Sequence, residues 1–256
     1  MSKWAWLIGA SDGLGFASAQ RLLHDGWSVV VSSRPSSRLD EACNRLAAIG
    51  EIVRRPFTLG LDDLPAVAAE VDAQCGGLGA VVLSGGGPPP ARAMAMTPEA
   101  LETAYRLVLE PAAMIVATIG QKMAERRDGV IILITSSGVA EPIPGLAPSN
   151  IMRAGVTALM KTAARELAEH DVRLVCVAPG RIDTSRVAAL DSAASSNLGV
   201  SIDEIRARSE AAIGMRRYGR PAEFAAVVGW LCGSEATYVT GTTISVDGGK
   251  SIGLLN

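Results

Sequence analysis

A loop with three glycines, Gly9-Ala10-Ser11-Asp12-Gly13-Leu14-Gly15, lies between a short apolar run and a segment with helical periodicity. Gly9 permits a tight turn out of the strand, Gly13 lets the backbone approach a pyrophosphate, and Gly15 lets the helix pack closely on the strand. The N–H groups at the start of that helix would point at the phosphates. This order of strand, loop and helix predicts a dinucleotide site, with Gly9, Ser11, Asp12, Gly13, Leu14 and Gly15 as cofactor-binding residues.

Apolar runs and helical segments alternate along the rest of the chain. Runs that predict strands lie at Trp4–Gly9, Ser28–Ser33, Ile52–Phe57, Ala80–Ser84, Val130–Thr135, Val172–Val177 and Thr243–Val246. Helical periodicity lies at Gly15–Asp25, Ser37–Ile49, Asp63–Gln74, Pro98–Arg127, Ile151–Glu169 and Pro221–Leu231. Continuous apolar strands are typical of a parallel sheet, because its strands are buried on both faces. We therefore expect an α/β fold: a single doubly wound Rossmann-type domain over residues 1–256, whose seven-stranded parallel sheet is flanked by helices.

The stretch from Arg181 to Met215 shows no regular pattern, and we expect an irregular lid or substrate segment at about residues 181–215. It follows a strand, at the edge of an open α/β sheet where ligands bind and lids close. Six arginines lie in or beside it: Arg181, Arg186, Arg206, Arg208, Arg216 and Arg217. They could attract an acidic substrate or an anionic thioester carrier, but exposed arginines are usually just solvated, and we favour that explanation.

Charge and cysteine usage restrict the partners. The net charge of −2 creates no field that attracts nucleic acid or an acidic membrane, and no apolar run is expected to be long enough to span a bilayer. The four cysteines, Cys43, Cys75, Cys176 and Cys232, form no CxxC pair and mostly lie in apolar runs. Reduced thiols of this kind are typical of a cytoplasmic protein, and no metal site is expected.

Further motifs follow in a fixed order along the last half of the chain: Ser136 at a strand end, Val177-Ala178-Pro179-Gly180 with Thr184, Gly219-Arg220-Pro221-Ala222-Glu223, Val239-Thr240-Gly241 and Val246-Asp247-Gly248-Gly249. Together with the GxxxGxG loop, they resemble the short-chain dehydrogenase/reductase family over essentially the whole chain, and most of all its reductases of β-ketoacyl thioesters. The resemblance implies an oxidoreductase that interconverts a ketone, such as a 3-oxoacyl thioester, and a secondary alcohol. It also places Pro179, Gly180, Ile182 and Thr184 against the cofactor.

The resemblance assigns the catalytic serine to Ser136, with Ser137 as the alternative if the register slips by one residue. Its hydroxyl would hydrogen-bond the substrate carbonyl as charge develops on the oxygen. The catalytic tyrosine and lysine of the family fall on Ser149, which follows Ser136 by 13 residues, and on Arg153. The helix asparagine of the family falls on Val108.

The serine at position 149 and the arginine at position 153 are compatible with cofactor binding but less suited to proton transfer. A serine hydroxyl is a weaker acid and reaches less far than a phenol, and an arginine stays charged and relays protons poorly, although it can bind ribose hydroxyls. Each residue also has an ordinary structural explanation. Ser136 could satisfy a backbone group at a strand end, Ser149 after Pro148 is better explained as a helix N-cap, and Arg153 could be a solvated helix charge.

The cofactor is predicted to be NADP rather than NAD. The second strand ends in Ser33 and Arg34, where NAD-specific sites carry an acidic residue, and an arginine suits the 2′-phosphate of NADP. Asp12 in the glycine loop argues against this, because its charge would repel that phosphate. The fourth strand ends in Ser84-Gly85-Gly86, where the family has an Asn-Ala-Gly run along the cofactor. Leu59-Gly60-Leu61 stands where an aspartate commonly contacts adenine.

Three functions fit these residues. The first is an NADP-dependent oxidoreductase with a small-molecule carbonyl or alcohol substrate, in which Ser136 polarises the carbonyl and the proton donor is unidentified. The second is a non-catalytic NADP(H)-binding or sensing protein. The third is a lyase or dehalogenase that uses Ser136 and Arg153; relatives of that kind block the cofactor cleft, so the intact glycine loop disfavours it. Small residues on Pro98–Arg127 and Ile151–Glu169, together with the resemblance, predict a homotetramer.

Overall fold

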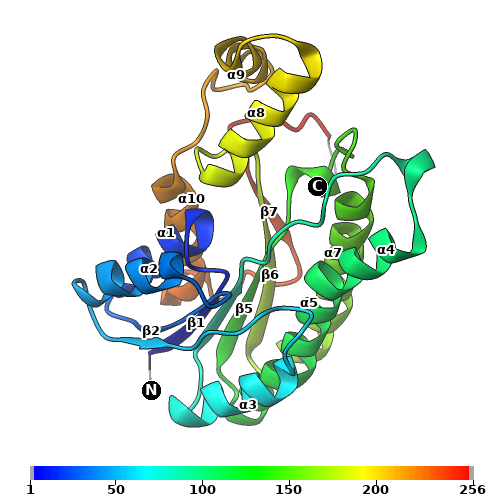
Figure 1. The fold of residues 1–256 in the computed structure, drawn as a ribbon. Helices are drawn as coiled ribbons and strands as arrows, with labels where there is room; N and C mark the ends of the chain where they lie inside the picture. The colour runs from blue at the N-terminus through cyan, green and yellow to red at the C-terminus, as the bar shows by residue number, and fades with distance from the viewer. Residues whose placement is uncertain (1–2, 254–256) are drawn as a thin grey trace.

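The computed structural model describes residues 3–253, in which seven parallel strands form one sheet in the order β3-β2-β1-β4-β5-β6-β7 (Figure 1). The strands are β1 (Trp4–Ile8), β2 (Ser28–Ser32), β3 (Ile52–Arg54), β4 (Ala80–Leu83), β5 (Gly129–Ile134), β6 (Val172–Pro179) and β7 (Thr243–Val246). The predicted doubly wound sheet is thus confirmed. Only β3 is markedly shorter than expected, although Arg55 and Phe57 still donate backbone N–H bonds of 3.0 and 3.1 Å toward β2.

Two apolar clusters hold helices on both faces of the sheet. One cluster lies under α1 (Gly13–His24), α2 (Ser37–Ala47) and α10 (Pro221–Cys232). The other lies under α3 (Leu64–Gln74), α7 (Ala147–Ala168) and the long helical stretch before β5 (Figure 1). Strands β1 to β6 contribute to both clusters because successive side chains point to opposite faces, which explains the continuous apolar runs, whereas β7 contributes Ile244 and Val246 to one cluster. Short 3₁₀ turns are η1 (Ala93–Ala95), η4 (Ser137–Val139) and η5 (Ser234–Ala236).

The long stretch Pro98–Arg126 is helical throughout but contains two π-helical turns. It consists of α4 (Pro98–Ala104), η2 (Tyr105–Leu109), α5 (Glu110–Ile115), η3 (Val116–Gly120) and α6 (Gln121–Arg126). By length and composition it could cross a membrane, contrary to the expectation that no apolar run is long enough. Its apolar stripe is buried in the domain core, which accounts for the hydropathy; the stripe comprises Ala104, Val108, Ala112, Ile115, Ile119 and Met123.

The expectation that residues 181–215 are irregular is wrong, whereas their role as a lid or substrate segment stays a prediction; this segment is called the lid below. Residues 181–215 contain α8 (Ser185–Leu198) and α9 (Ile202–Ala211), which project beyond the carboxyl ends of the strands (Figure 1). The local signals were present: Thr184 and Ser201 cap the two helices with their side-chain oxygens, and Gly199 ends α8 in the left-handed conformation, with φ of 67°. They are hard to detect because each helix buries only one residue, so neither shows an apolar stripe.

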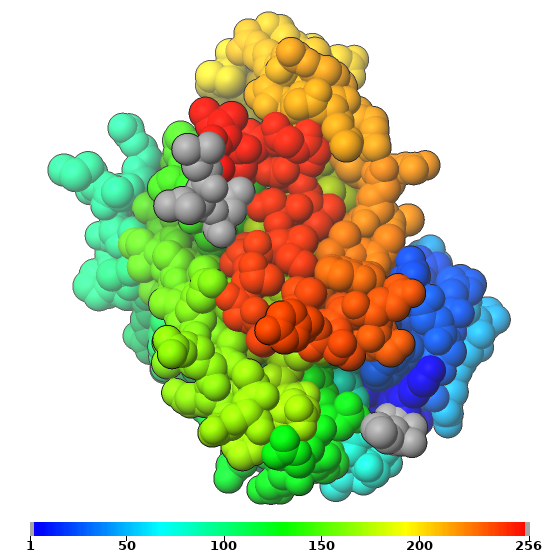
Figure 2. Space-filling model, turned by 180° about the vertical axis from the view of Figure 1, so that it is seen from behind, coloured from blue at the N-terminus to red at the C-terminus, as the bar shows by residue number. Residues whose placement is uncertain are grey.

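The C-terminal part of the chain lies on the opposite side from the viewer of Figure 1. Figure 2 shows it as the red surface between the segment that contains α7 and the orange segment that contains α10. β7 is an edge of the sheet, and all of its residues are partly exposed. On α7, Ala154 and Ala158 are exposed as well. These surfaces are compatible with the predicted homotetramer, which stays a prediction.

Candidate active site

The glycine loop lies where the strand order reverses, between β1 and β4. Gly9 has a φ of 79°, and a Cβ built on it would lie 1.9 Å from the carbonyl oxygen of Ser84. A Cβ on Gly15 would lie 2.4 Å from the carbonyl oxygen of Gly9. Only glycine fits either position, and the helix starts at Gly13, two residues earlier than predicted. Its N–H groups face the switch point, where open α/β sheets bind their ligands.

The Asp12 carboxylate is tied to the protein rather than free to repel a phosphate. It accepts the N–H of Gly13 at 2.7 Å and the hydroxyl of Ser185 from the lid, and lies 3.9 Å from Arg38. The Ser185 hydrogen bond, followed by the Gly13 bond and the charge of Arg38, lowers the pKa of Asp12. Its charge is thereby partly compensated, which weakens the sequence argument against NADP.

The loop is also joined to the second strand. The Ser11 and Ser33 hydroxyls form a hydrogen bond of 3.0 Å, and Leu14 packs on the apolar cluster under α1. Sequence analysis did not identify Ser185 or Arg38 as part of this region. Arg38 lies four residues after Arg34 in a predicted helix start, which is the signal that could have found it.

A cleft of about 550 Å³ opens beside the loop, between the ends of β1, β2 and β4. Its lining brings together the predicted residues Gly9, Ser33, Arg34, Ser84, Gly85 and Gly86, and adds Phe57, Leu59, Gly60, Gly87 and Arg106. None of the residues that line this cleft is acidic. Arg106 is paired with Glu102 at 2.7 Å, whereas Arg34 has no carboxylate partner among the described residues. The cleft therefore offers an uncompensated cation next to the end of β2.

Ser136 lies two residues after the end of β5 and is half-buried. Its Oγ accepts the N–H of Gly138 at 3.1 Å and so caps the short η4 turn. This is the ordinary strand-end role considered for the residue. The hydroxyl proton is still available to donate, so a role toward a carbonyl oxygen is compatible with the same geometry.

Ser149 is not the N-cap of its helix, contrary to the explanation favoured from the sequence. α7 begins at Ala147, with Leu146 at the cap position and no side-chain cap bond. The segment before the helix is instead held by Asn150, whose amide donates to the Ile143 carbonyl at 2.9 Å. Ser149 thus lies inside the first turn, where its Oγ accepts the Nε–H of Arg153 at 3.2 Å.

Arg153 is half-buried and is not a solvated helix charge. Its Nη1 donates to the carbonyls of Ile134 and Thr135, at 2.8 and 2.9 Å, where β5 ends. Burial, followed by repulsion from Arg186, lowers the pKa of the Arg153 guanidinium to about 10, so the group remains charged at neutral pH. No carboxylate pairs with it within residues 3–253. Ser149 and Arg153 therefore form a hydrogen-bonded pair, and Arg153 anchors this pair to the end of β5.

A small cavity lies behind this pair, between the end of β4 and the long helical stretch. It measures about 20 Å³ and is lined by Gly85, Gly86, Arg153 and apolar side chains that include the buried Val108. A volume of this size holds about one water molecule. Val108 faces it from η2, at the position to which the resemblance assigns the asparagine of the family.

The end of β6 brings the last group of predicted residues to the same edge. Pro179 ends the strand, and a Cβ on Gly180 would lie 2.7 Å from the Cα of Asp247, so β6 and β7 approach closely here. Ile182 is buried. The methyl group of Thr184 faces Gly13: a Cβ built on Gly13 would lie 3.5 Å from Cγ2 of Thr184. Thr184 thereby links the lid to the start of α1.

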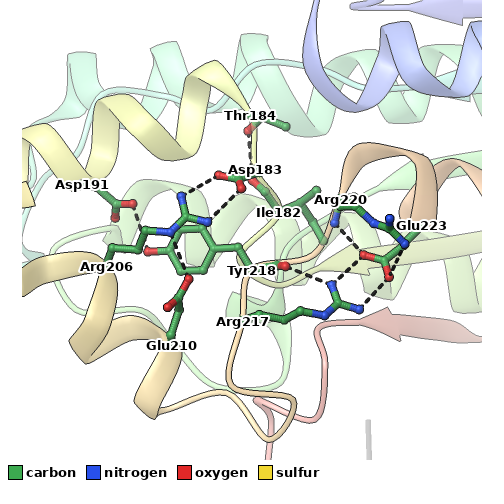
Figure 3. Close-up of polar contacts among 10 residues, drawn as sticks. All are labelled: Ile182, Asp183, Thr184, Asp191, Arg206, Glu210, Arg217, Tyr218, Arg220 and Glu223. Carbon is green, nitrogen blue, oxygen red and sulfur yellow. Dashed lines mark hydrogen bonds and ion pairs between the residues drawn. The ribbon is translucent and has the colours of Figure 1, made fainter. Parts of the chain in front are cut away.

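Two arginines of this segment, Arg181 and Arg206, hold it together, so the expectation that the arginines are merely solvated is wrong for these two, whereas Arg208, Arg216 and Arg217 are exposed, as expected. Arg181 and the hydroxyl of Tyr218 both bind the buried carboxylate of Asp191, at 2.5 and 3.0 Å. Arg206 stacks 4.4 Å from the Tyr218 ring centroid and binds both oxygens of Asp183, as Figure 3 shows. Arg208 and Arg217 pair with Glu204 and Glu223, and Arg216 donates to the Ala211 carbonyl.

Comparisons with known proteins agree with this geometry. A family model described as enoyl-(acyl carrier protein) reductase matches residues 9–251. The chain is 31% identical over 254 residues to dehydrogenase/reductase SDR family member 4 of Bos taurus, which covers 97% of this chain and 87% of that protein. It resembles a solved actinorhodin polyketide ketoreductase with NADPH, at 27% identity, 98% coverage of both chains and a TM-score of 0.88. It also resembles L-sorbose reductase from Gluconobacter frateurii, complexed with NADPH and L-sorbose, at 24% identity, coverage of 99% and 98%, and a TM-score of 0.92.

The Rossmann sheet, the glycine loop at its switch point and these relatives define an oxidoreductase of the dehydrogenase/reductase class. The chain belongs to the short-chain dehydrogenase/reductase family.

Proposed function

We propose that this chain is an NADP-dependent oxidoreductase that interconverts a ketone and a secondary alcohol in a non-standard active site. The observation that supports NADP most directly is the 550 Å³ cleft, in which no lining residue is acidic and Arg34 has no carboxylate partner in the described part of the chain. An NAD site would present a carboxylate to the ribose 2′-hydroxyl, whereas a guanidinium complements the 2′-phosphate. A 3-oxoacyl thioester remains one candidate substrate. Cytoplasmic location and the absence of nucleic-acid and membrane partners stay predictions.

The residues at the switch point fit the cofactor. The N-terminus of α1 would hold the pyrophosphate, Ser33 and Arg34 the 2′-phosphate, and Gly85 and Gly86 the central part of the molecule. The close approach of Gly9 to Ser84 leaves the surface between β1 and β4 free of side chains, as a bound dinucleotide requires. Pro179, Gly180, Ile182 and Thr184 would cover the nicotinamide. When bound, the nicotinamide supplies or accepts the hydride.

Two residues of the chain would act on the carbonyl oxygen. The Ser136 hydroxyl donates a hydrogen bond to that oxygen, and the Arg153 guanidinium stabilises the negative charge that develops there. Neither group is a good acid near neutral pH. We propose that the proton reaches the oxygen from solvent water through the Ser149 hydroxyl, which is held by its hydrogen bond to Arg153. Turnover would be slower than with a phenol donor.

The second candidate is a non-catalytic NADP(H)-binding or sensing protein. Two observations favour it. The Arg153 guanidinium already donates to the Ile134 and Thr135 carbonyls, and Val108 offers no polar group that could take part in proton transfer. The third candidate, a lyase or dehalogenase, is less favoured because the cofactor cleft is open rather than filled by side chains.

A fluorescence titration with NADPH and NADH tests the cofactor assignment. The parent protein should bind NADPH more tightly, and Arg34→Ala should reduce that preference by about 10- to 100-fold, the value of a charge-assisted bond. Arg54→Ala is the matched control, because Arg54 is an exposed arginine nearby that pairs with Asp40. Equal affinity for both cofactors, or equal effects of the two substitutions, would contradict the assignment.

Turnover on a panel of ketones then separates the first two candidates. Slow NADPH oxidation by the parent supports the enzyme. Tight NADPH binding with no turnover, combined with activity in the Ser149→Tyr, Arg153→Lys double variant, supports the sensing protein, because only the proton donor was then missing. Arg153→Lys alone is the control for the loss of the guanidinium.

A further inference from the structure

One lid arginine differs from the others. Arg186, in the first turn of α8, has no hydrogen bond or ion pair with any described residue, whereas Arg181, Arg206, Arg208 and Arg217 all pair with carboxylates. Its guanidinium turns toward the active site instead. A Cβ built on Gly87, just after β4, would lie 2.9 Å from Nη2 of Arg186. The unpaired cation thus lies at the mouth of the site.

A second cation lies behind the same glycine run. Arg153 lines the small cavity together with Gly85 and Gly86, and Gly87 is the next residue along the chain. The two charges are close enough for Arg186 to lower the pKa of Arg153. Neither has an acidic partner among residues 3–253. Two guanidinium groups that converge without a counter-ion repel each other, and an anion between them would relieve that repulsion.

We propose that Arg186, together with the charge of Arg153, binds an anionic group of the substrate, so that the substrate is a carbonyl compound that carries a carboxylate. The proposal rests on the proposed function, because it identifies the substrate class of the same site. Arg186 forms the outer contact and selects the substrate, while Arg153 also faces the carbonyl oxygen. A bidentate pair between the Arg186 fork and a carboxylate would fix the orientation of the substrate.

The position of Arg186 favours the substrate over the cofactor as the source of the anion. The pyrophosphate is assigned to the start of α1 and the 2′-phosphate to Arg34, both on the β1 and β2 side of the switch point. Arg186 contacts Gly87, which lines the cofactor cleft, but it also lies close enough to Arg153 to repel its charge, and Arg153 is held at the end of β5 and is assigned to the carbonyl oxygen. A phosphate of the cofactor is nevertheless the same kind of ligand, and the experiment separates the two sources.

The test compares matched acids and esters: acetoacetate with methyl acetoacetate, and levulinate with methyl levulinate. Each is titrated into the protein–NADP⁺ complex, which cannot reduce a ketone, and its binding is followed by isothermal titration calorimetry, so that the measurement does not depend on turnover. The parent should bind at least one acid more tightly than its ester. Arg186→Ala should weaken binding of that acid by about 10- to 100-fold and leave the ester and NADPH itself unchanged. Arg208→Ala, a lid arginine paired with Glu204, should change none of the three affinities.

The outcomes distinguish this inference from the proposed function. If NADPH does not bind, both fail. If NADPH binds but no acid is preferred over its ester, or if Arg186→Ala weakens acid and ester equally, the carboxylate site is wrong and the cofactor assignment stands. If Arg186→Ala weakens NADPH binding by the factor predicted for the acid, the anion is a phosphate of the cofactor and the substrate assignment is overturned. Circular dichroism and a thermal melt confirm that the variant is folded.

Discussion

The buried carboxylate of Asp191 is expected to keep the lid folded onto the domain, and Asp191→Ala should release it. Asp191 is 4% exposed and accepts from Arg181 and from the Tyr218 hydroxyl. Its removal leaves that hydroxyl with Ser209 as a partner but without its charged acceptor, at a cost of about 1–3 kcal/mol. Arg181 keeps 29% of its side chain exposed and recovers part of its hydration, so its loss adds only about 1 kcal/mol. The sum is about 2–4 kcal/mol of lid stability.

Amide hydrogen exchange measured by mass spectrometry is the appropriate assay, because it reports local opening separately from global unfolding. In Asp191→Ala, peptides from residues 185–211 should exchange about 30- to 700-fold faster, while those from β4 and β5 are unchanged. Tyr218→Phe removes only one hydrogen bond and should cost about 1 kcal/mol. Unchanged exchange in the lid would refute the reasoning. So would a uniform acceleration across the sheet, because Asp191 would then stabilise the whole domain.

Three further predictions concern the loop, the lid and the assembly. Gly9→Ala should abolish NADPH binding in the fluorescence titration. Gly26→Ala is the control, because Gly26 has a similar φ of 82° but a Cβ built on it meets no atom within 4 Å. This control should lose only about 1 kcal/mol of stability in urea denaturation and should still bind NADPH. Hydrogen bonding to Arg206 lowers the pKa of Asp183. The contribution of this ion pair to lid stability is therefore present above the unfolded-state pKa of Asp183 and is lost as the pH falls through its folded-state pKa. Limited proteolysis of the lid should increase below about pH 4 but not between pH 5 and 8. Ala158→Arg on the exposed face of α7 should dissociate the predicted homotetramer, and an unchanged mass in light scattering would contradict that interface.

The fold could be predicted because its signals are local. Each strand is an apolar run, and the glycine loop requires conformations and close contacts that few other residues allow, as the φ of Gly9 and its approach to Ser84 demonstrate. The lid helices could not be predicted in the same way. Their stability comes from caps and from ion pairs with residues outside them, such as Arg181 with Asp191, and not from an apolar stripe.

The sequence by itself determined the class of protein, the order of its strands and helices and the residue types at the predicted site, including Ser149 and Arg153 at the positions to which the resemblance assigns a tyrosine and a lysine. Only the tertiary structure decided which charges are compensated. Asp12 meets Ser185 across 173 residues of sequence, Arg153 binds the end of β5, and Arg186 has no hydrogen-bond or ion-pair partner within residues 3–253. The reason is physical: strand and loop formation depend on neighbouring residues, whereas the effect of a charge depends on distances that only the folded chain sets.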